Sequence, residues 1–378
     1  MTASCILRRS SMTLILEESL VLEEIVVKGY EKVVKVTDKK SGLVGIICIH
    51  NTSLGPALGG IRIYPYSTFD AALNDAMRLA KGMTYKSALA QTGLGGGKSV
   101  IIASPTQKTP ELLYAFGQAV NQLEGLYICA EDVGCTPEDL KIIREATPYV
   151  VGLVHEKSSG NPAPYTAWGT YRGIQSVMQK LYGDSSVFDR TIAIQGLGSV
   201  GARLAELLFW EGAKLIISDI DEEKTARLAK TYGAGTASHQ DILKVECDVL
   251  APCALGGILS ADTIPNLRCK AVAGCANNQL LKDSDGDILL KRGILYAPDF
   301  IINAGGLINV TEELAEEGYS PSVARGKTHN LYDELMKIYE MADNNKISTH
   351  AAALSLGDYR IKYGIGKREY RVQISHAR

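Results

Sequence analysis

Apolar side chains in the first part of this chain recur with two different periods. Residues 32–38 alternate polar and apolar side chains, residues 39–42 are rich in turn formers, and residues 43–50 are almost entirely apolar, which together predict a β-hairpin. Residues 68–85 instead repeat apolar side chains at the spacing of an amphipathic helix. The N-terminal part is therefore expected to mix strands and helices.

The same alternation continues toward the middle of the chain. Short apolar runs at 98–103 and 126–129 predict strands, and helical spacing at 110–123 and 136–146 predicts helices. The second of these helices opens with Thr-Pro-Glu, an order typical of a helix N-terminus. A stretch rich in Ser, Gly, Asn and Pro then occupies 158–164 and predicts a boundary between two domains.

After that boundary the pattern predicts a sheet of parallel strands. A long helix at 165–182 precedes an apolar strand at 191–195, a helix at 202–211 and a second strand at 214–218. Strands that are joined through helices run parallel and build a doubly wound α/β domain. Further short apolar runs are expected to continue this sheet at 249–251, 271–273 and 294–296.

A glycine motif lies at the first strand–helix junction of this second domain. Gly196, Gly198 and Gly201 form G-x-G-x-x-G directly after the strand, and Asp219 ends the next strand. In this context the motif predicts dinucleotide binding, with the pyrophosphate at the helix N-terminus. Asp219 would accept a hydrogen bond from the ribose 2′-hydroxyl and repel a 2′-phosphate, which favours NAD over NADP. The alternative for Asp219 is an ordinary acidic residue at a strand end.

A second glycine-rich segment, at 81–99, carries two lysines. Lys98 directly follows three glycines, and Lys86 lies twelve residues before it. The segment is not a phosphate-binding P-loop, because that motif needs glycine at the position of Thr92. A lysine in a closed, dry site can have its pKa lowered and act as a base near neutral pH. The segment therefore predicts a site that binds an anion and moves a proton; the alternative is a glycine-rich turn with a solvated lysine.

Composition narrows the range of partners. A length of 378 residues suggests two domains, and 40 basic against 42 acidic residues leave a net charge of −2. Such a balance gives no electrostatic reason to expect nucleic acid or a membrane surface, and no apolar run is long enough for a membrane-spanning helix. The eight cysteines show no zinc-like spacing. We expect reduced thiols, no metal site and a cytoplasmic protein.

Five motifs occur in order along the chain, at 54–62, 83–86, 95–98, 130–134 and 303–306. Through these motifs, nearly the whole chain, from about residue 12 to about residue 350, is similar to the glutamate/leucine/phenylalanine/valine dehydrogenase family, with leucine-using members as the nearest match. The resemblance implies NAD-dependent, reversible oxidative deamination of an L-amino acid to a 2-oxo acid with release of ammonia. It also implies a homo-oligomer, an octamer or a dimer, and a cleft between the two domains.

The resemblance implies roles for single residues. Lys98 looks like the catalytic lysine, Asp132 like its proton-transfer partner, and Lys86, with a loop at Gly59 and Gly60, like the site of the substrate carboxylate. Loss of hydride from Cα leaves an iminium, which a base must hydrate and a second proton carrier must help to collapse to ketone and ammonia. Lys86 as a nearby cation would also lower the pKa of Lys98. The alternative for Asp132 is a helix cap or a structural ion pair.

Leu58 argues against glutamate as the substrate. Glutamate-using members carry a lysine at this position, and a charged side chain placed against leucine would be desolvated at a cost. We therefore expect leucine, with valine and isoleucine. Leu307 departs from the leucine pattern and resembles phenylalanine enzymes, so phenylalanine or another aromatic amino acid stays an alternative; a non-catalytic NAD-binding homologue is a further one. The pocket is expected to be lined by Leu58, Met83, Ala130, Leu307 and Val310.

The first domain is expected to span 12–150, to bind substrate and to form the oligomer, with a returning segment at 347–378. The second, Rossmann-like domain is expected at 151–346, and residues 1–11 are expected to be a disordered extension. Ligands of doubly wound sheets bind beyond the carboxyl ends of the strands, where the loops of this domain lie. The expected cofactor-binding residues are Gly196, Gly198, Ser199, Val200, Gly201, Asp219, Thr166, Cys253, Ala254, Ala276, Asn277, Asn278 and Asn303. The expected substrate-binding residues are Lys86, Gly59, Gly60, Leu58, Met83, Ala130, Leu307, Val310 and Asn278.

Overall fold

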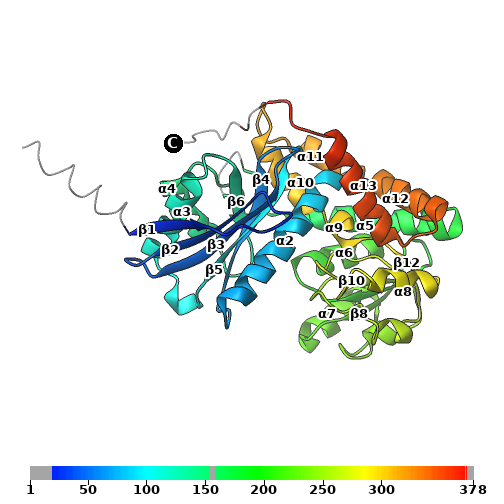
Figure 1. Ribbon diagram of the computed structural model, residues 1–378. Coiled ribbons are helices and arrows are strands. Elements are labelled where there is room, and N and C mark those ends of the chain that lie inside the picture. Colours follow the sequence, from blue (N-terminus) through cyan, green and yellow to red (C-terminus); the bar gives the residue numbers. More distant parts are fainter. Residues whose placement is uncertain (1–18, 154–157, 371, 373–378) are drawn as a thin grey trace, which may run out of the picture. The chain divides into compact units, whose positions relative to one another are not determined.

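The computed structural model describes residues 19–153, 158–370 and 372, and the extension expected at 1–11 lies outside them. The chain forms two compact units, which confirms the two-domain α/β architecture (Figure 1). Unit 1 holds the chain up to Gly160, Glu313–Glu317 and the chain from Gly364; unit 2 holds Asn161–Glu312 and Gly318–Tyr363. The division between Gly160 and Asn161 falls within the turn-rich stretch 158–164, ten residues after the expected domain boundary at 150/151. The cleft expected between the domains stays a prediction.

Unit 1 is built on a six-stranded mixed sheet with the order β1-β2-β3-β5-β4-β6. The pairs β1–β2, β2–β3 and β3–β5 are antiparallel, whereas the pairs β5–β4 and β4–β6 are parallel. The expected hairpin is confirmed as β2 and β3. The strands are β1 (Leu20–Glu24), β2 (Lys32–Asp38), β3 (Leu43–Asn51), β4 (Ala57–Tyr64), β5 (Gly95–Ile102) and β6 (Tyr127–Glu131).

Helices cover both faces of this sheet. Figure 1 shows α2 on one face and α3 with α4 on the other, and a separate apolar cluster lies on each side. Each helix begins at a threonine in extended backbone whose hydroxyl accepts an N–H of the first turn, at Thr68, Thr109 and Thr136, which satisfies a donor that the helix cannot pair. The helices are α2 (Phe69–Leu89), α3 (Pro110–Asn121) and α4 (Pro137–Ala146).

The glycine-rich segments of unit 1 lie inside strands, which corrects two expectations. Gly95–Gly97 open β5, so the strand expected from residue 98 begins three residues earlier, and Gly59 with Gly60 lie within β4 rather than in a loop. A Cβ atom on Gly96 would come within 2.1 Å of the backbone nitrogen of Thr84 in α2. Glycine is used here because α2 packs closer to the sheet than any side chain would allow.

Unit 2 is built on a six-stranded sheet with the order β12-β11-β10-β7-β8-β9, in which every neighbouring pair is parallel. This is the strand order of doubly wound dinucleotide-binding domains, and it reverses between β7 and β10. The strands are β7 (Thr191–Gln195), β8 (Lys214–Ser218), β9 (Gly235–Thr236), β10 (Cys247–Pro252), β11 (Cys269–Val272) and β12 (Leu295–Tyr296).

The helices of unit 2 connect these strands and extend the domain. One apolar cluster lies along β10 and β11, where Leu250 and Val272 pack with side chains of the following segments. The helices are α5 (Ala163–Tyr182), α6 (Ser199–Trp210), α7 (Glu222–Tyr232), α8 (Asp285–Lys291), α9 (Asp299–Ile302), α10 (Gly305–Thr311), α11 (Pro321–His329), α12 (Leu331–Asn345) and α13 (Thr349–Tyr363).

The C-terminal segment returns to unit 1 later than expected. Helix α13 belongs to unit 2, because Thr349 donates to the carbonyl of Tyr296 at 2.6 Å and Arg360 pairs with Glu334 of α12 at 2.5 Å. The predicted start of the return at residue 347 is therefore wrong, and the return begins at Gly364. There Arg368 donates to the main-chain carbonyls of Gly93 and Leu314, among others, which anchors the segment.

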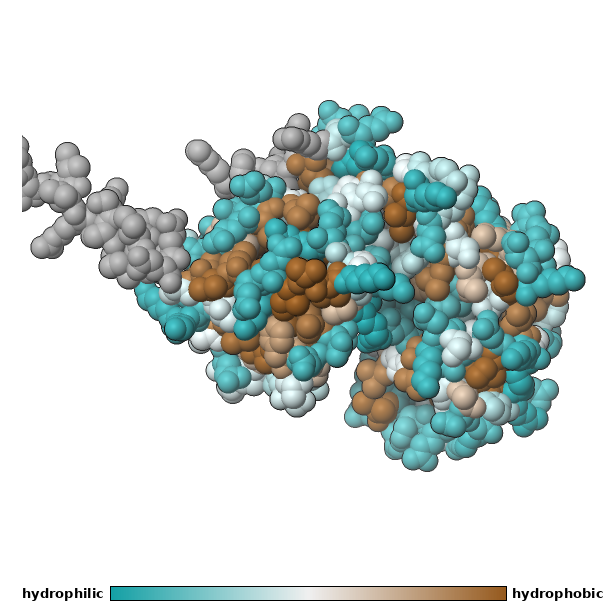
Figure 2. Space-filling view, in the orientation of Figure 1, coloured by the Kyte–Doolittle hydropathy of each residue, from teal (hydrophilic) through white to brown (hydrophobic). Residues whose placement is uncertain are grey.

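The face drawn in Figure 2 mixes apolar and hydrophilic residues over the described part of the chain. Figure 2 shows apolar residues in separate patches among hydrophilic ones on the visible face of each unit. Among the residues with described positions, no helix combines the length and the apolar character needed to cross a membrane.

Candidate active site and cofactor site

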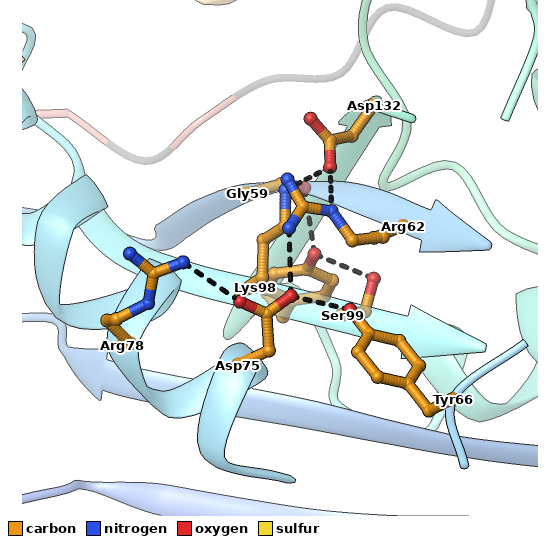
Figure 3. Close-up of polar contacts among 9 residues, drawn as sticks. Gly59, Arg62, Tyr66, Asp75, Arg78, Lys98, Ser99 and Asp132 are labelled. Atoms are coloured by element: carbon orange, nitrogen blue, oxygen red, sulfur yellow. Dashed lines mark hydrogen bonds and ion pairs between the residues drawn. The ribbon is translucent and has the colours of Figure 1, made fainter. Parts of the chain in front are cut away.

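Lys98 and Asp132 form an ion pair in unit 1, over β4, the middle one of the three parallel strands β5, β4 and β6. Lys98 lies in β5, Asp132 directly follows β6, and the Lys98 Nζ is 2.8 Å from the Asp132 Oδ2 (Figure 3). The strand between them carries Gly60, where a Cβ atom would lie 2.7 Å from the Asp132 Cβ and 3.2 Å from the Lys98 Nζ. Gly60 therefore supplies the space in which this ion pair forms.

Arg62 is a third charged member of the site, and the sequence interpretation gave it no role. It follows Gly60 by two positions on β4, so both residues share one face of the sheet. Its Nε donates to the same Asp132 oxygen at 3.0 Å, and another guanidinium nitrogen donates to the Asp75 Oδ2 at 2.8 Å. The two-residue spacing from Gly60 is the sequence signal that could have revealed it.

Asp75, on α2, holds Arg62 in place from the other side. The Tyr66 hydroxyl donates to its Oδ2 at 2.5 Å, and Arg78 pairs with its Oδ1 at 3.1 Å (Figure 3). Below this layer, the buried Tyr127 donates to the Gly59 carbonyl at 2.8 Å and lies 3.0 Å from the Ser99 Oγ. These contacts fix β4 and β5 relative to each other beneath the Lys98–Asp132 pair.

Burial and charge act on the two titratable groups of the pair. Burial lowers the pKa of Lys98, and the Arg62 charge adds to this effect against the opposing charge of Asp132. Burial by itself raises the pKa of Asp132, but the charges of Lys98 and Arg62 outweigh it, so that pKa is lowered. The sequence interpretation assigned Lys86 as the cation that lowers the pKa of Lys98, which stays a prediction, and Arg62 is a cation with that effect. The site combines a carboxylate held ionised with an amine that gives up its proton more readily than usual.

Apart from Gly59, the remaining predicted residues of unit 1 lie on or beside the same face of the sheet. Strand register pairs Leu58 with Gly96 and Gly60 with Ala130, and alternation along the strands places them on the Lys98 face. Gly59 points to the opposite face. Met83 and Lys86, one helical turn apart and both half-buried, lie near the C-terminal end of α2, which covers this face.

The glycine motif of unit 2 forms a tight turn at the point where the strand order reverses. Gly196 has a φ of +95°, and its Cβ would lie 2.7 Å from the Cβ of Ala254 beyond β10. A Cβ on Gly201 would lie 2.0 Å from the Gly196 carbonyl oxygen, so only glycine lets α6 start this close to the strand. Gly198 is exposed with open space around it, and Ser199 and Val200 follow as the first residues of α6.

Asp219, which directly follows β8, holds this turn through hydrogen bonds of its carboxylate. Its Oδ2 accepts the Leu197 N–H at 2.5 Å and its Oδ1 accepts the Asp221 N–H at 3.0 Å. Burial raises the pKa of Asp219 and these N–H groups lower it, with a net lowering. The carboxylate therefore stays ionised, and each oxygen keeps a lone pair for a further donor.

Other predicted residues of unit 2 join the strand-end loops. The Cys253 N–H donates to the Gln195 carbonyl at 2.7 Å, and the Asn303 side chain donates to the Asn277 Oδ1 at 2.8 Å. Asn278 has a φ of +51° and donates its N–H to Asp299 at 2.7 Å, while Ala276 donates to the carbonyl of Pro252 at 2.9 Å. Thr166, Leu307 and Val310 are half-buried on α5 and α10 of unit 2. The five expected pocket residues therefore come from both units, three from unit 1 and two from unit 2.

The strand-end loops of unit 2 fit a bound dinucleotide. Gly198, the residue before α6, has no side chain that could accept a hydrogen bond from the helix. The first N–H groups of α6 are therefore not capped by a side chain of this residue. At the same edge, three buried side-chain oxygens have no hydrogen-bond partner within the described part of the chain: Gln195 Oε1, Ser218 Oγ and Asn303 Oδ1. Uncapped donors suit the pyrophosphate, and unpaired acceptors suit ribose hydroxyls and the carboxamide of NAD. Among the described residues no His, Cys, Asp and Glu side chains cluster to hold a metal ion.

Comparisons with known proteins decide the family. Residues 30–149 match the model of the Glu/Leu/Phe/Val dehydrogenase dimerisation domain, and residues 216–362 match that of glutamate/leucine/phenylalanine/valine dehydrogenase. The chain belongs to this family. It is 47% identical to leucine dehydrogenase from Thermoactinomyces intermedius, over 88% of this chain and 91% of that protein. It is 45% identical to phenylalanine dehydrogenase from Caldalkalibacillus thermarum, over 89% and 92%.

A solved structure extends the similarity. The crystal structure of L-tryptophan dehydrogenase from Nostoc punctiforme matches with a TM-score of 0.80 and 42% identity, over 89% of this chain and 97% of that one. As a member of the Glu/Leu/Phe/Val dehydrogenase family, the chain is an NAD(P)-dependent oxidoreductase that acts on the CH–NH2 group of amino acids.

Proposed function

We propose that this chain is an NAD-dependent dehydrogenase that deaminates L-leucine, and also valine and isoleucine, to the 2-oxo acid and ammonia in a reversible reaction. Unit 1 binds the amino acid and unit 2 binds the cofactor. The observation that carries the proposal is the buried Lys98–Asp132 pair at 2.8 Å, because it places a lysine of lowered pKa beside an ionised carboxylate. The identity of 47% to a leucine dehydrogenase supports the substrate.

In this proposal each charged residue of unit 1 has one task. Lys86 binds the substrate carboxylate, and NAD, when bound, supplies the acceptor for the hydride that leaves Cα. Lys98 takes a proton from the water that attacks the iminium carbon, and Asp132 gives and takes a proton while the carbinolamine collapses to ketone and ammonia. Arg62 keeps Asp132 ionised and oriented through its hydrogen bond at 3.0 Å.

The side chain of the substrate meets apolar residues. Leu58 is buried on the Lys98 face and offers no partner for a second carboxylate, so a glutamate side chain would lose its hydration without compensation. Apolar pockets discriminate one or two methylene groups by only about 1–3 kcal/mol, so valine and isoleucine should also react. Aromatic amino acids are the second candidate, because Leu307 follows the phenylalanine pattern and relatives at 43% and 45% identity are named for tryptophan and phenylalanine.

Three further features belong to the proposal. The ionised Asp219 favours NAD over NADP, because it would repel a 2′-phosphate on the ribose. Unit 1 matches a model described as a dimerisation domain, which supports a homo-oligomer. Reduced cysteines and the near-neutral charge suit a cytoplasmic enzyme.

The test is formation of NADH by the purified protein with leucine, valine, isoleucine, phenylalanine, tryptophan and glutamate, each compared by kcat/KM. Leucine should give the highest value, the other branched-chain substrates should follow, and glutamate should give essentially none. A preference for an aromatic substrate would shift the assignment to the second candidate. Absence of NADH with every amino acid would refute the catalytic proposal and favour a non-catalytic homologue.

A further inference from the structure

Two pairs of cysteines lie across neighbouring strands of unit 2. Cys247 and Cys269 face each other in register at the start of β10 and β11. Cys253 and Cys275 each follow six residues later, beyond the carboxyl ends of the same strands, and all four are reduced. The first pair is buried at the base of the sheet, whereas Cys253 is only half-buried. The two pairs thus share strands and sequence spacing but differ in surroundings.

The second pair is held in contact by its backbone. A Cβ atom on Gly274 would lie 2.2 Å from the carbonyl oxygen of Pro252, so these two chain segments approach as closely as glycine permits. The Ala276 N–H donates to the same carbonyl at 2.9 Å. Both the thiol and the backbone N–H of Cys275 hydrogen-bond to the Cys253 sulfur. Neighbouring strands lie about 4.8 Å apart, within the Cα separation of about 4.4–6.8 Å that a disulfide spans.

The surroundings also favour the thiolate form of Cys253. Gly201 lies in the first turn of the twelve-residue helix α6. A Cβ atom on Gly201 would lie 3.2 Å from the Cβ of Cys253, so Cys253 is next to this helix N-terminus. A helix N-terminus stabilises a thiolate. The largest effect on the pKa of Cys253 is the hydrogen bond from the Cys275 thiol, which lowers this pKa although burial raises it. In the other pair, burial raises the pKa of Cys247 to about 12 and that of Cys269 to about 11. Only the second pair is therefore set up to react.

We propose that Cys253 and Cys275 form a reversible oxidation site that a hydroperoxide converts to a disulfide. The Cys253 thiolate attacks one peroxide oxygen, the O–O bond breaks, and the products are a sulfenic acid and a hydroxide that is protonated to water. The Cys275 sulfur then attacks the Cys253 sulfur, the S–S bond forms, and the sulfenic oxygen leaves as water with the Cys275 proton. Two thiols lose two electrons, and one hydrogen peroxide becomes two waters.

This modification site is distinct from the dehydrogenase reaction, but its place affects the cofactor. Cys253 lies beside the α6 N-terminus, where the proposed function puts the pyrophosphate, so bound NADH should slow the oxidation of this pair. That protection rests on the proposed function, whereas formation of the disulfide does not.

The test is treatment of the purified full-length protein with hydrogen peroxide, followed by thiol titration after denaturation and by peptide mapping. We expect the eight thiols to fall to six, a linked peptide that joins Cys253 to Cys275, and full recovery with dithiothreitol. Cys275→Ser should prevent formation of any disulfide at Cys253 on peroxide treatment. The matched control Cys269→Ser should still form the 253–275 disulfide. A link elsewhere, or eight thiols remaining, would overturn the proposal. A 253–275 link that forms equally fast with NADH present would support the site and contradict the proposed cofactor position.

Discussion

Replacing Arg62 with methionine should move the pH dependence of catalysis toward higher pH. Arg62 and Lys98 both contact the Asp132 Oδ2, at 3.0 Å and 2.8 Å, so their nitrogen atoms are no more than about 6 Å apart. Two unit charges at that separation repel by about 0.7 kcal/mol in water and by about 3 kcal/mol at an effective dielectric constant of 20. Arg62→Met removes this repulsion, and it also takes one cationic partner away from Asp75 and from Asp132. Both changes favour protonated Lys98.

The sign of the expected shift follows from the role of Lys98. Its pKa is lowered by burial and by Arg62, so its pKa rises when Arg62 is removed. The neutral amine then forms only at higher pH, and the acidic limb of the kcat profile should move upward in pH. At fixed neutral pH the variant should turn over more slowly, with the affinity for NADH nearly unchanged, because Arg62 belongs to the other unit.

The assay is the pH profile of leucine-dependent NADH formation, with circular dichroism to confirm that each variant is folded. Arg78→Met is the matched control, because Arg78 pairs with the same Asp75 at 3.1 Å but is 58% exposed and has no hydrogen bond to Asp132. Its profile should overlay that of the wild type. An Arg62→Met profile that does not move, or that moves to lower pH, would refute the electrostatic reasoning.

Three further changes test other parts of the structure. Gly60→Ala places a Cβ 2.7 Å from the Asp132 Cβ and should abolish most activity, whereas Gly82→Ala, with open space around it in α2, should keep activity and gain about 0.5–1 kcal/mol of stability; equal losses in kcat would contradict this. Asp219→Asn should raise the ratio of kcat/KM for NADP to that for NAD, and an unchanged ratio would remove Asp219 from cofactor choice. Arg368→Ala should free the segment from Gly364 onward, since it loses its side-chain contacts to Gly93 and Leu314; limited proteolysis should cut there faster, and unchanged cleavage would show that other contacts hold it.

Local patterns were sufficient for much of the fold. The hairpin at β2 and β3, the first βαβ unit of unit 2 and the threonine that caps α4 follow from periodicity and capping chemistry, because they depend on residues close in sequence. The glycines of β4 were assigned to a loop, and those of β5 were left out of the strand expected from residue 98. Local propensity disfavours glycine in strands, and only the tertiary packing of α2 against Gly96 explains its presence.

The sequence analysis named the lysine and the aspartate of the candidate site, but it did not predict the hydrogen bonds and ion pairs that hold them. The glycine-rich segment drew attention to Lys98, and the family resemblance implied Asp132 as its partner. Arg62 and Asp75 act through a network that spans β4, α2 and β6, and their distances depend on strand order. The sequence analysis also ended unit 2 too early, at residue 346. Helix α13 belongs to unit 2 because it pairs with α12, a contact that no local sequence pattern reveals.

The most direct test of the central claim is Lys98→Ala, measured by leucine-dependent NADH formation in a single turnover and by NADH binding through fluorescence. The protein should stay folded, because Asp132 keeps its ion pair with Arg62. We predict that NADH formation is lost while NADH affinity stays nearly that of the wild type. Near-normal turnover would show that Lys98 is not the base, and an equal loss of NADH binding would show that its role has been misplaced.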